Sequence, residues 1–85
     1  MPQWNITIDV SEIWKNFQDV GFEESVKQIV AKIKESRWRS ITPYPHTFDQ
    51  LVADLEASTS LDEFNSWWNE LYDLADSDRV WIATF

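Results

Sequence analysis

Apolar and polar residues alternate strictly along residues 4–10. The apolar members of this stretch are Trp4, Ile6, Ile8 and Val10. A period of two places these side chains on one face of an extended chain, so the pattern predicts a strand with one buried face. Ser11 follows as an N-cap, because its hydroxyl can accept a hydrogen bond from the first turn of a helix. We expect a short helix from Ser11 through Phe17.

Three later stretches repeat their apolar residues at the helical period. The first is expected from Phe22 to about Arg37, with acids in its first turn and bases in its last turns, as the helix dipole favours. The others begin at residues 47–50 and 60–63, each with the form of a capping box. The last helix carries a wide apolar stripe, so one of its paired indoles should lie at the core margin. This stripe consists of Leu61, Phe64, Trp67, Trp68, Leu71, Leu74 and Ala75.

The segments outside these helices have their own signals. Residues 39–46 contain Pro43 and Pro45 and are expected to form an extended loop. Residues 76–78 are expected to form a turn, and residues 79–85 a final strand. That strand is apolar on both faces, which is typical of a strand inside a sheet or covered by a partner.

The order of elements predicts an α+β fold in one domain, residues 1–85. We expect the N- and C-terminal strands to pair in a small antiparallel sheet, packed on three to four helices. A two-stranded sheet is marginal in water. Either the helices stabilise it sufficiently, or a free strand edge pairs with a second copy in a homodimer.

Composition makes the core aromatic. The chain has six Trp, five Phe and two Tyr, and no Cys that could form a disulfide or a thiolate metal site. Each aromatic ring can bury about 150–250 Å², so a few of them supply much of a small core. We expect most Trp side chains to be buried and one or two to stay exposed as interface anchors.

Charge divides the chain in two. Residues 1–42 hold six acids and six bases, whereas residues 43–85 hold nine acids and one base, so the second part carries the whole net charge of −8. This asymmetry favours a basic partner. It argues against direct binding of nucleic acid or of anionic membrane. The chain lacks a membrane-length apolar run and a secretory signal, so a cytosolic location is expected by default.

Catalytic chemistry has little support in the sequence. His46 is the single histidine and lies in the predicted loop without a positioned partner. Asp73, Asp76 and Asp78 could offer oxygen ligands to Ca²⁺ or Mg²⁺, but their spacing is not that of an EF-hand. A solvated helix end is favoured there, and a metal-dependent enzyme is the competing hypothesis. We expect no enzyme, no cofactor and no bound metal.

Basic residues between Lys27 and Arg39 surround Trp38. Such a run could hold a nucleic-acid strand. A solvated helix face is favoured instead, and a contact with the acidic half of a second copy is the next alternative.

The acids of the second half are the strongest functional signal. They fall on two predicted helices and a turn: Asp49, Asp54, Glu56, Asp62, Glu63, Glu70, Asp73, Asp76 and Asp78. The predicted function is a non-enzymatic interaction protein that binds a protein partner through an acidic helical surface and exposed aromatics. Its candidate binding residues are Asp62, Glu63, Trp67, Trp68, Glu70 and Asp73. The alternatives are a nucleic-acid mimic, whose carboxylates stand in for phosphates, and a self-assembling structural subunit.

Three short motifs also carry a resemblance. They are the segment from Trp4 to Ser11, Phe22-Glu23-Glu24, and a basic amphipathic helix closing on Ser36-Arg37-Trp38. Together they resemble small uncharacterised proteins of bacteriophages that infect actinobacteria, over residues 3–38. The chain departs from that pattern at Gly21, where such proteins often have Thr or Ser. The resemblance implies a small phage protein made in a bacterial cytoplasm, where many such proteins bind and modulate host machinery. The expected partner is therefore a host or phage protein.

Overall fold

The computed structural model describes residues 7–83. The predicted positions Trp4, Ile6 and Phe85 lie outside the described residues. Six helices and two short strands make up the described chain. In order they are β1 (Thr7–Asp9), α1 (Ser11–Lys15), α2 (Phe17–Val20), α3 (Phe22–Glu35), α4 (Trp38–Ile41), α5 (Pro45–Ala57), α6 (Leu61–Asp78) and β2 (Trp81–Ala83).

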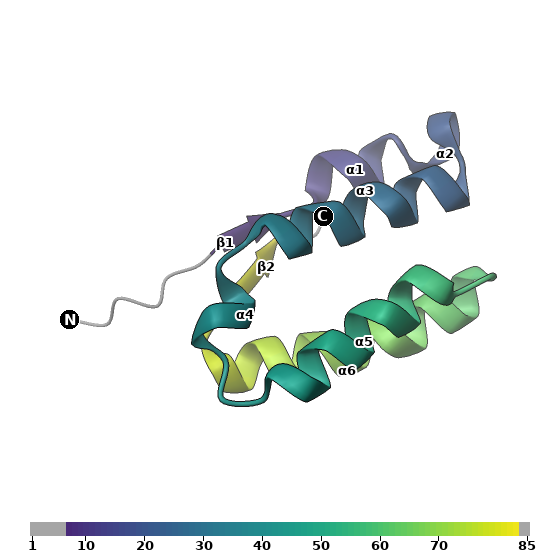
Figure 1. Ribbon diagram of the computed structural model, residues 1–85. Helices are drawn as coiled ribbons and strands as arrows, with labels where there is room; N and C mark the ends of the chain where they lie inside the picture. The colour runs from purple at the N-terminus through teal and green to yellow at the C-terminus, as the bar shows by residue number, and fades with distance from the viewer. Residues whose placement is uncertain (1–6, 84–85) are drawn as a thin grey trace.

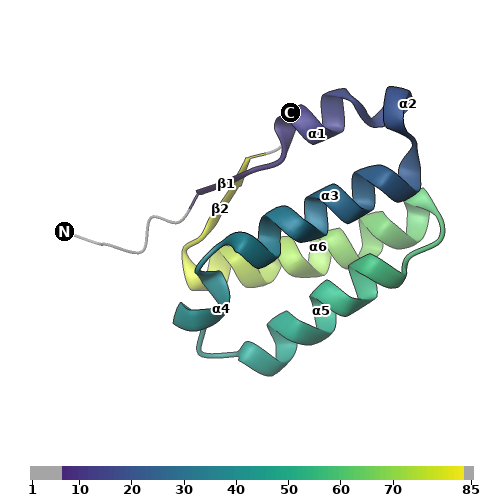
Figure 2. The same ribbon diagram turned by 45° about the horizontal axis from the view of Figure 1, so that its top comes forward.

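The helices form two layers, with α1, α2 and α3 in one and α5 and α6 in the other (Figure 1). The short helix α4 and the sheet lie at one end of both layers (Figures 1 and 2). The molecule is elongated, with extents of 40 × 23 × 18 Å. Within residues 7–83, no helix combines the length and the apolarity that a bilayer crossing requires.

The two strands pair as expected, but they are parallel and not antiparallel. Thr7 lies opposite Trp81, and Ile8 opposite Ile82. The direction follows from the path of the chain. After β1 the chain runs away from the sheet through α1 and α2, returns along α3, leaves along α5 and returns along α6 (Figure 1). An even number of passes brings β2 in at the same end as β1, so both strands run the same way.

The core lies between the two helical layers and against the inner face of the sheet. Ile8 and Ile82 are its members in the sheet. The prediction of an aromatic core is confirmed for Trp38 and Trp68, which are both buried. Burying one large apolar side chain contributes about 1.5–3 kcal/mol. The most deeply buried apolar side chains are Val10, Ile29, Val30, Ile33, Trp38, Leu55, Phe64 and Leu71.

Helix starts follow the sequence signals in part. The capping box at Ser60 is confirmed, because the Ser60 hydroxyl accepts a hydrogen bond of 3.2 Å from the backbone N–H of Glu63. The capping box at Thr47 is wrong, since α5 begins earlier, with Pro45 in its first turn. Proline favours that position, because its missing N–H would have no helical acceptor there.

The N-terminal helical segment also differs from the prediction. Ser11 does not cap α1; its backbone N–H and its hydroxyl both donate to Asp9 Oδ1, at 3.0 and 2.6 Å. These two bonds lower the pKa of Asp9, with the hydroxyl bond as the larger cause. The predicted single helix is divided at Asn16 into α1 and α2.

The predicted turn at residues 76–78 is wrong, because α6 continues to Asp78. Arg79 then ends the helix in the left-handed conformation, with φ of 61°. The predicted loop at residues 39–46 is also partly wrong, since α4 occupies its start.

Candidate functional site

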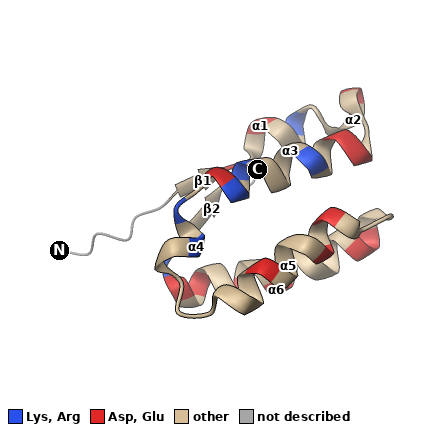
Figure 3. Ribbon diagram, viewed as in Figure 1, with Lys and Arg blue, Asp and Glu red and all other residues tan. Residues whose placement is uncertain are grey.

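The exposed side of α6 carries most of the acids that the sequence singled out. Asp62 and Asp73 are both exposed and lie eleven residues apart, close to three helical turns and about 16 Å along the axis. Glu63 and Glu70 are also exposed and lie seven residues apart, close to two turns. We call the four residues Asp62, Glu63, Glu70 and Asp73 the acidic face. Figure 3 shows acids along α6, whereas bases gather on α3 and α4.

The N-terminal end of the acidic face is held by the helix cap. Glu63 Oε1 accepts hydrogen bonds from the backbone N–H of Thr59 at 3.0 Å and from its hydroxyl at 3.3 Å. Asp62 and Glu63 lie in the first turn of α6. Negative charge is favourable there, because unpaired N–H groups give this end of a helix a partial positive charge. These two carboxylates therefore also stabilise the helix.

At the C-terminal end of α6 the same charge is unfavourable. The last turn of α6 contains no base. Asp76 is exposed in this turn, where an acid typically costs about 0.3–1 kcal/mol. Helix stability therefore does not explain why position 76 is an acid. The negative charge of Asp76 adds to that of the acidic face.

Asp78 has a structural role. The Trp38 indole N–H donates to Asp78 Oδ2 at 2.8 Å, and the Trp38 side chain is completely buried. This bond joins the start of α4 to the end of α6. Trp38 therefore cannot stack on a nucleic-acid base, so the interpretation of the basic run as a stacking platform is wrong on this point.

The paired indoles of α6 divide between core and surface. Trp68 is 8 % exposed and stacks on Phe64, with ring centroids 5.7 Å apart, so we remove it from the candidate surface. Trp67 is 36 % exposed. It follows Glu63 by four residues and precedes Glu70 by three, spacings that place neighbouring side chains on one face of a helix. Trp67 is therefore the exposed aromatic that accompanies the acidic face.

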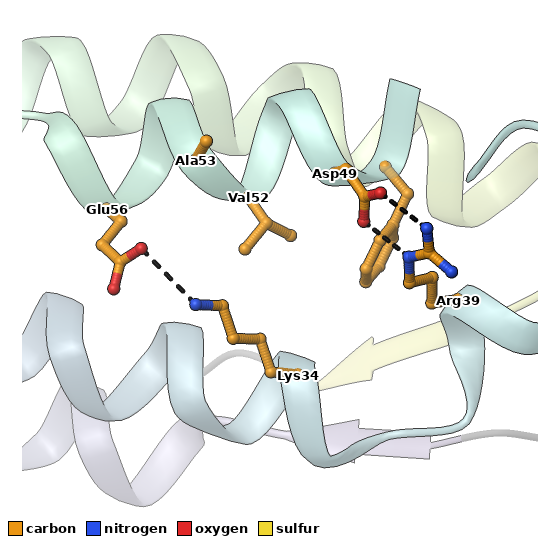
Figure 4. A pocket seen from close by; sticks show the side chains of 7 residues that line it. Lys34, Arg39, Asp49, Val52, Ala53 and Glu56 are labelled. Atoms are coloured by element: carbon orange, nitrogen blue, oxygen red, sulfur yellow. Dashed lines mark hydrogen bonds and ion pairs between the residues drawn. The ribbon is translucent and has the colours of Figure 1, made fainter. Parts of the chain in front are cut away.

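Two of the three acids of α5, Asp49 and Glu56, are in a different situation, because bases of the first half neutralise them (Figure 4). Arg39 forms two bonds to Asp49, from Nε at 2.7 Å and from Nη2 at 2.8 Å. Lys34 Nζ lies 3.5 Å from Glu56 Oε1. The hydrogen bonds from Arg39 are the largest cause that lowers the pKa of Asp49, and they also raise the pKa of Arg39.

The two ion pairs bracket a shallow groove of about 290 Å³ between α5 and the α3–α4 segment (Figure 4). Its floor is apolar and is formed by Phe48, Val52 and Ala53. None of the lining side chains carries a hydroxyl, thiol or imidazole, and the charged groups at each end are paired with one another.

Sequence reasoning missed these cross-half ion pairs and one exposed aromatic. Trp81 is 68 % exposed, on the outer face of the sheet. The sequence feature that could have indicated this exposure is the position of Trp81 in a strand that is apolar on both faces. Among the residues that the structure describes, no group of three or more His, Cys, Asp or Glu side chains is arranged to hold a metal ion.

No family model, curated protein or solved structure matches the chain. The acidic face and Trp67 are therefore assigned from the geometry of the chain itself.

Proposed function

We propose that this protein is a non-enzymatic interaction module that binds a basic protein through the acidic face of α6 and Trp67. The resemblance of its first part to phage proteins favours a partner in a bacterial host or in the phage itself. The partner would present Lys or Arg side chains to the face.

The observation that carries the proposal is a difference between two helices. On α5, Asp49 and Glu56 are each paired with a base. On α6, within the described part of the chain, Asp62, Glu70 and Asp73 have no base in ion-pair distance. Their charges extend outward from one side of one rigid element. Such a charged surface accelerates the encounter with a basic partner and selects against acidic ones.

Trp67 adds a contact that does not depend on charge alone. Its indole lies between Glu63 and Glu70 in helical position, so a Lys or Arg side chain can place its apolar stem on the ring and its charge near a carboxylate. A cation over an indole face contributes about 0.5–1 kcal/mol at an exposed site. This contact, together with ion pairs along the acidic face, would give a specific complex.

The test uses deca-lysine as a basic probe and two quadruple variants of equal charge. The first variant neutralises the acidic face with Asp62→Asn, Glu63→Gln, Glu70→Gln and Asp73→Asn. Gln at position 63 can still accept the capping hydrogen bond. The matched control neutralises four exposed acids elsewhere, with Glu12→Gln, Asp19→Asn, Glu23→Gln and Glu24→Gln.

We expect the first variant to lose at least tenfold in affinity, measured by calorimetry, and the control to lose less than threefold. Raising the salt concentration should weaken binding of the wild type strongly. Trp67→Ala should weaken binding at high salt, where the charge contribution is screened. Equal losses in the two quadruple variants would mean that the probe responds to net charge alone, and the proposal would be wrong.

A further inference from the structure

The segment α1–α2, residues 11–20, is attached to the fold differently from every longer helix. Neither α1 nor α2 contains a buried residue. By contrast, α3, α5 and α6 each bury four or five residues. With five and four residues, α1 and α2 are also far below the length at which a helix is stable by itself. This segment, here called the strap, therefore depends on a few side-chain contacts.

Those contacts are made by rings. Trp14 meets Phe64 edge-on at a centroid distance of 5.5 Å and Trp68 at 6.5 Å. Phe17 lies 6.2 Å from Phe22. Ile13, Trp14 and Phe22 are partly buried against the core. The ion pairs Lys34–Glu56 and Arg39–Asp49 join other elements and do not hold the strap.

The two ends of the strap have opposite properties. Val10 is completely buried, and its backbone N–H bonds to the Ala83 carbonyl at 3.1 Å, so the first end is fixed to the sheet. Gly21 at the second end has φ of 92°, a conformation that only glycine adopts readily. No atom lies within 4 Å of the position that a Cβ on Gly21 would take. Gly21 is therefore suited to be a hinge, free of steric contact on its Cβ side.

The strap covers the middle of an apolar stripe on α6. Leu61, Phe64, Trp68 and Tyr72 follow one another at spacings of three and four residues, so they share a side of the helix. At the two ends of this stripe, Leu61 is 44 % exposed and Tyr72 is 41 % exposed. In the middle, Phe64 and Trp68 are buried and contact Trp14.

We propose that the strap opens as one unit while the rest of the fold stays intact, and that this opening separates Trp14 from Phe64 and Trp68. Local opening of this kind is expected where few apolar contacts hold a segment. The proposal concerns α1 and α2 and not the acidic face, so it stands independently of the proposed function.

Native-state hydrogen exchange of the full chain, read by NMR at several low urea concentrations, tests it. The informative amides include those of Trp14, Val20 and Gly21, which donate to the carbonyls of Val10, Asn16 and Phe17. We expect strap amides to share one protection factor, at least tenfold below that of the slowest α6 amides. Because opening exposes several rings, their exchange should increase with urea, with a slope smaller than that of global unfolding.

Val52→Ala distinguishes the alternatives further, because Val52 is buried on α5 and has no ring contact with the strap. It should accelerate exchange in α5 and α6 and leave the strap amides within twofold of wild type. Three results would overturn the proposal. Exchange of the strap amides could depend on urea as steeply as global unfolding does. It could be independent of urea, with protection that differs from amide to amide. Finally, Val52→Ala could accelerate exchange of the strap amides as much as that of the α6 amides.

Discussion

Removing the Asp78 side chain should destabilise the fold well beyond the effect of removing any neighbouring acid. Asp78 accepts the indole N–H of the fully buried Trp38 at 2.8 Å. In Asp78→Ala that donor loses its acceptor, and a buried donor without a partner costs about 1–3 kcal/mol. A domain of this size unfolds with about 0.05–0.15 kcal/mol of stability per residue, so the loss is a substantial fraction of the total.

Urea unfolding followed by circular dichroism measures this loss. With a slope of about 1 kcal/mol/M for a small domain, the midpoint should fall by about 1–3 M. Each kcal/mol should also lower the Tm by about 4–8 °C. Asp78→Asn keeps a carbonyl acceptor for the indole and should lose less than Asp78→Ala.

Asp76→Ala is the matched control, because Asp76 lies in the same last turn but is exposed. It should change stability by less than about 0.5 kcal/mol, or stabilise slightly by removing an acid from the helix C-terminus. If Asp78→Ala and Asp76→Ala had equal effects, the bond between α4 and α6 would contribute nothing, and the reasoning would be refuted.

Three further predictions concern single positions. Ser25→Ala should raise the free energy of unfolding by about 0.5–1.5 kcal/mol, seen as a higher urea midpoint, since the buried Ser25 hydroxyl has no hydrogen-bond partner among the described residues and Ala is the better helix former; a lower midpoint would contradict this. Asp49→Asn should destabilise the protein at neutral pH and progressively less as the pH falls below about 3.9. The folded pKa of Asp49 is lowered, so its stabilisation is present above the unfolded pKa and is lost as the pH falls through the folded pKa; a pH-independent difference would contradict this. Trp81→Ser should leave stability within about 0.5 kcal/mol, whereas Ile82→Ala on the opposite face of β2 should cost about 2–5 kcal/mol; similar losses in calorimetry would show that the outer face is covered.

The helices could be predicted from the sequence because their signals are local. The apolar spacing of α3 and the capping box at Ser60 each lie within one element. The direction of β2 could not be predicted in the same way. It depends on how many times the chain crosses the length of the molecule, and the break of the first helix at Asn16 has no strong sequence signal.

The exposure of the acids on α6 could be predicted from the sequence, but the pairing of acids with distant residues could not. The exposure of Asp62 and Asp73 follows from their distance from the apolar stripe of α6. The pairing of Asp49 with Arg39 joins α5 to α4, and the bond from Trp38 to Asp78 spans forty residues. No pattern within one helix shows which acids will meet such partners. The sequence therefore overestimates the acidic surface, because Asp49 and Glu56 of α5 are paired with bases.

The most direct test of the acidic face is a titration of the ¹⁵N-labelled protein with deca-lysine, followed by chemical-shift changes of the backbone and of the Trp67 indole N–H. Binding at this face predicts that the largest changes fall on residues 62–73 and on the Trp67 indole, while the amides around Asp19, Glu23 and Glu24 change little. Changes spread evenly over all the exposed acids would contradict it.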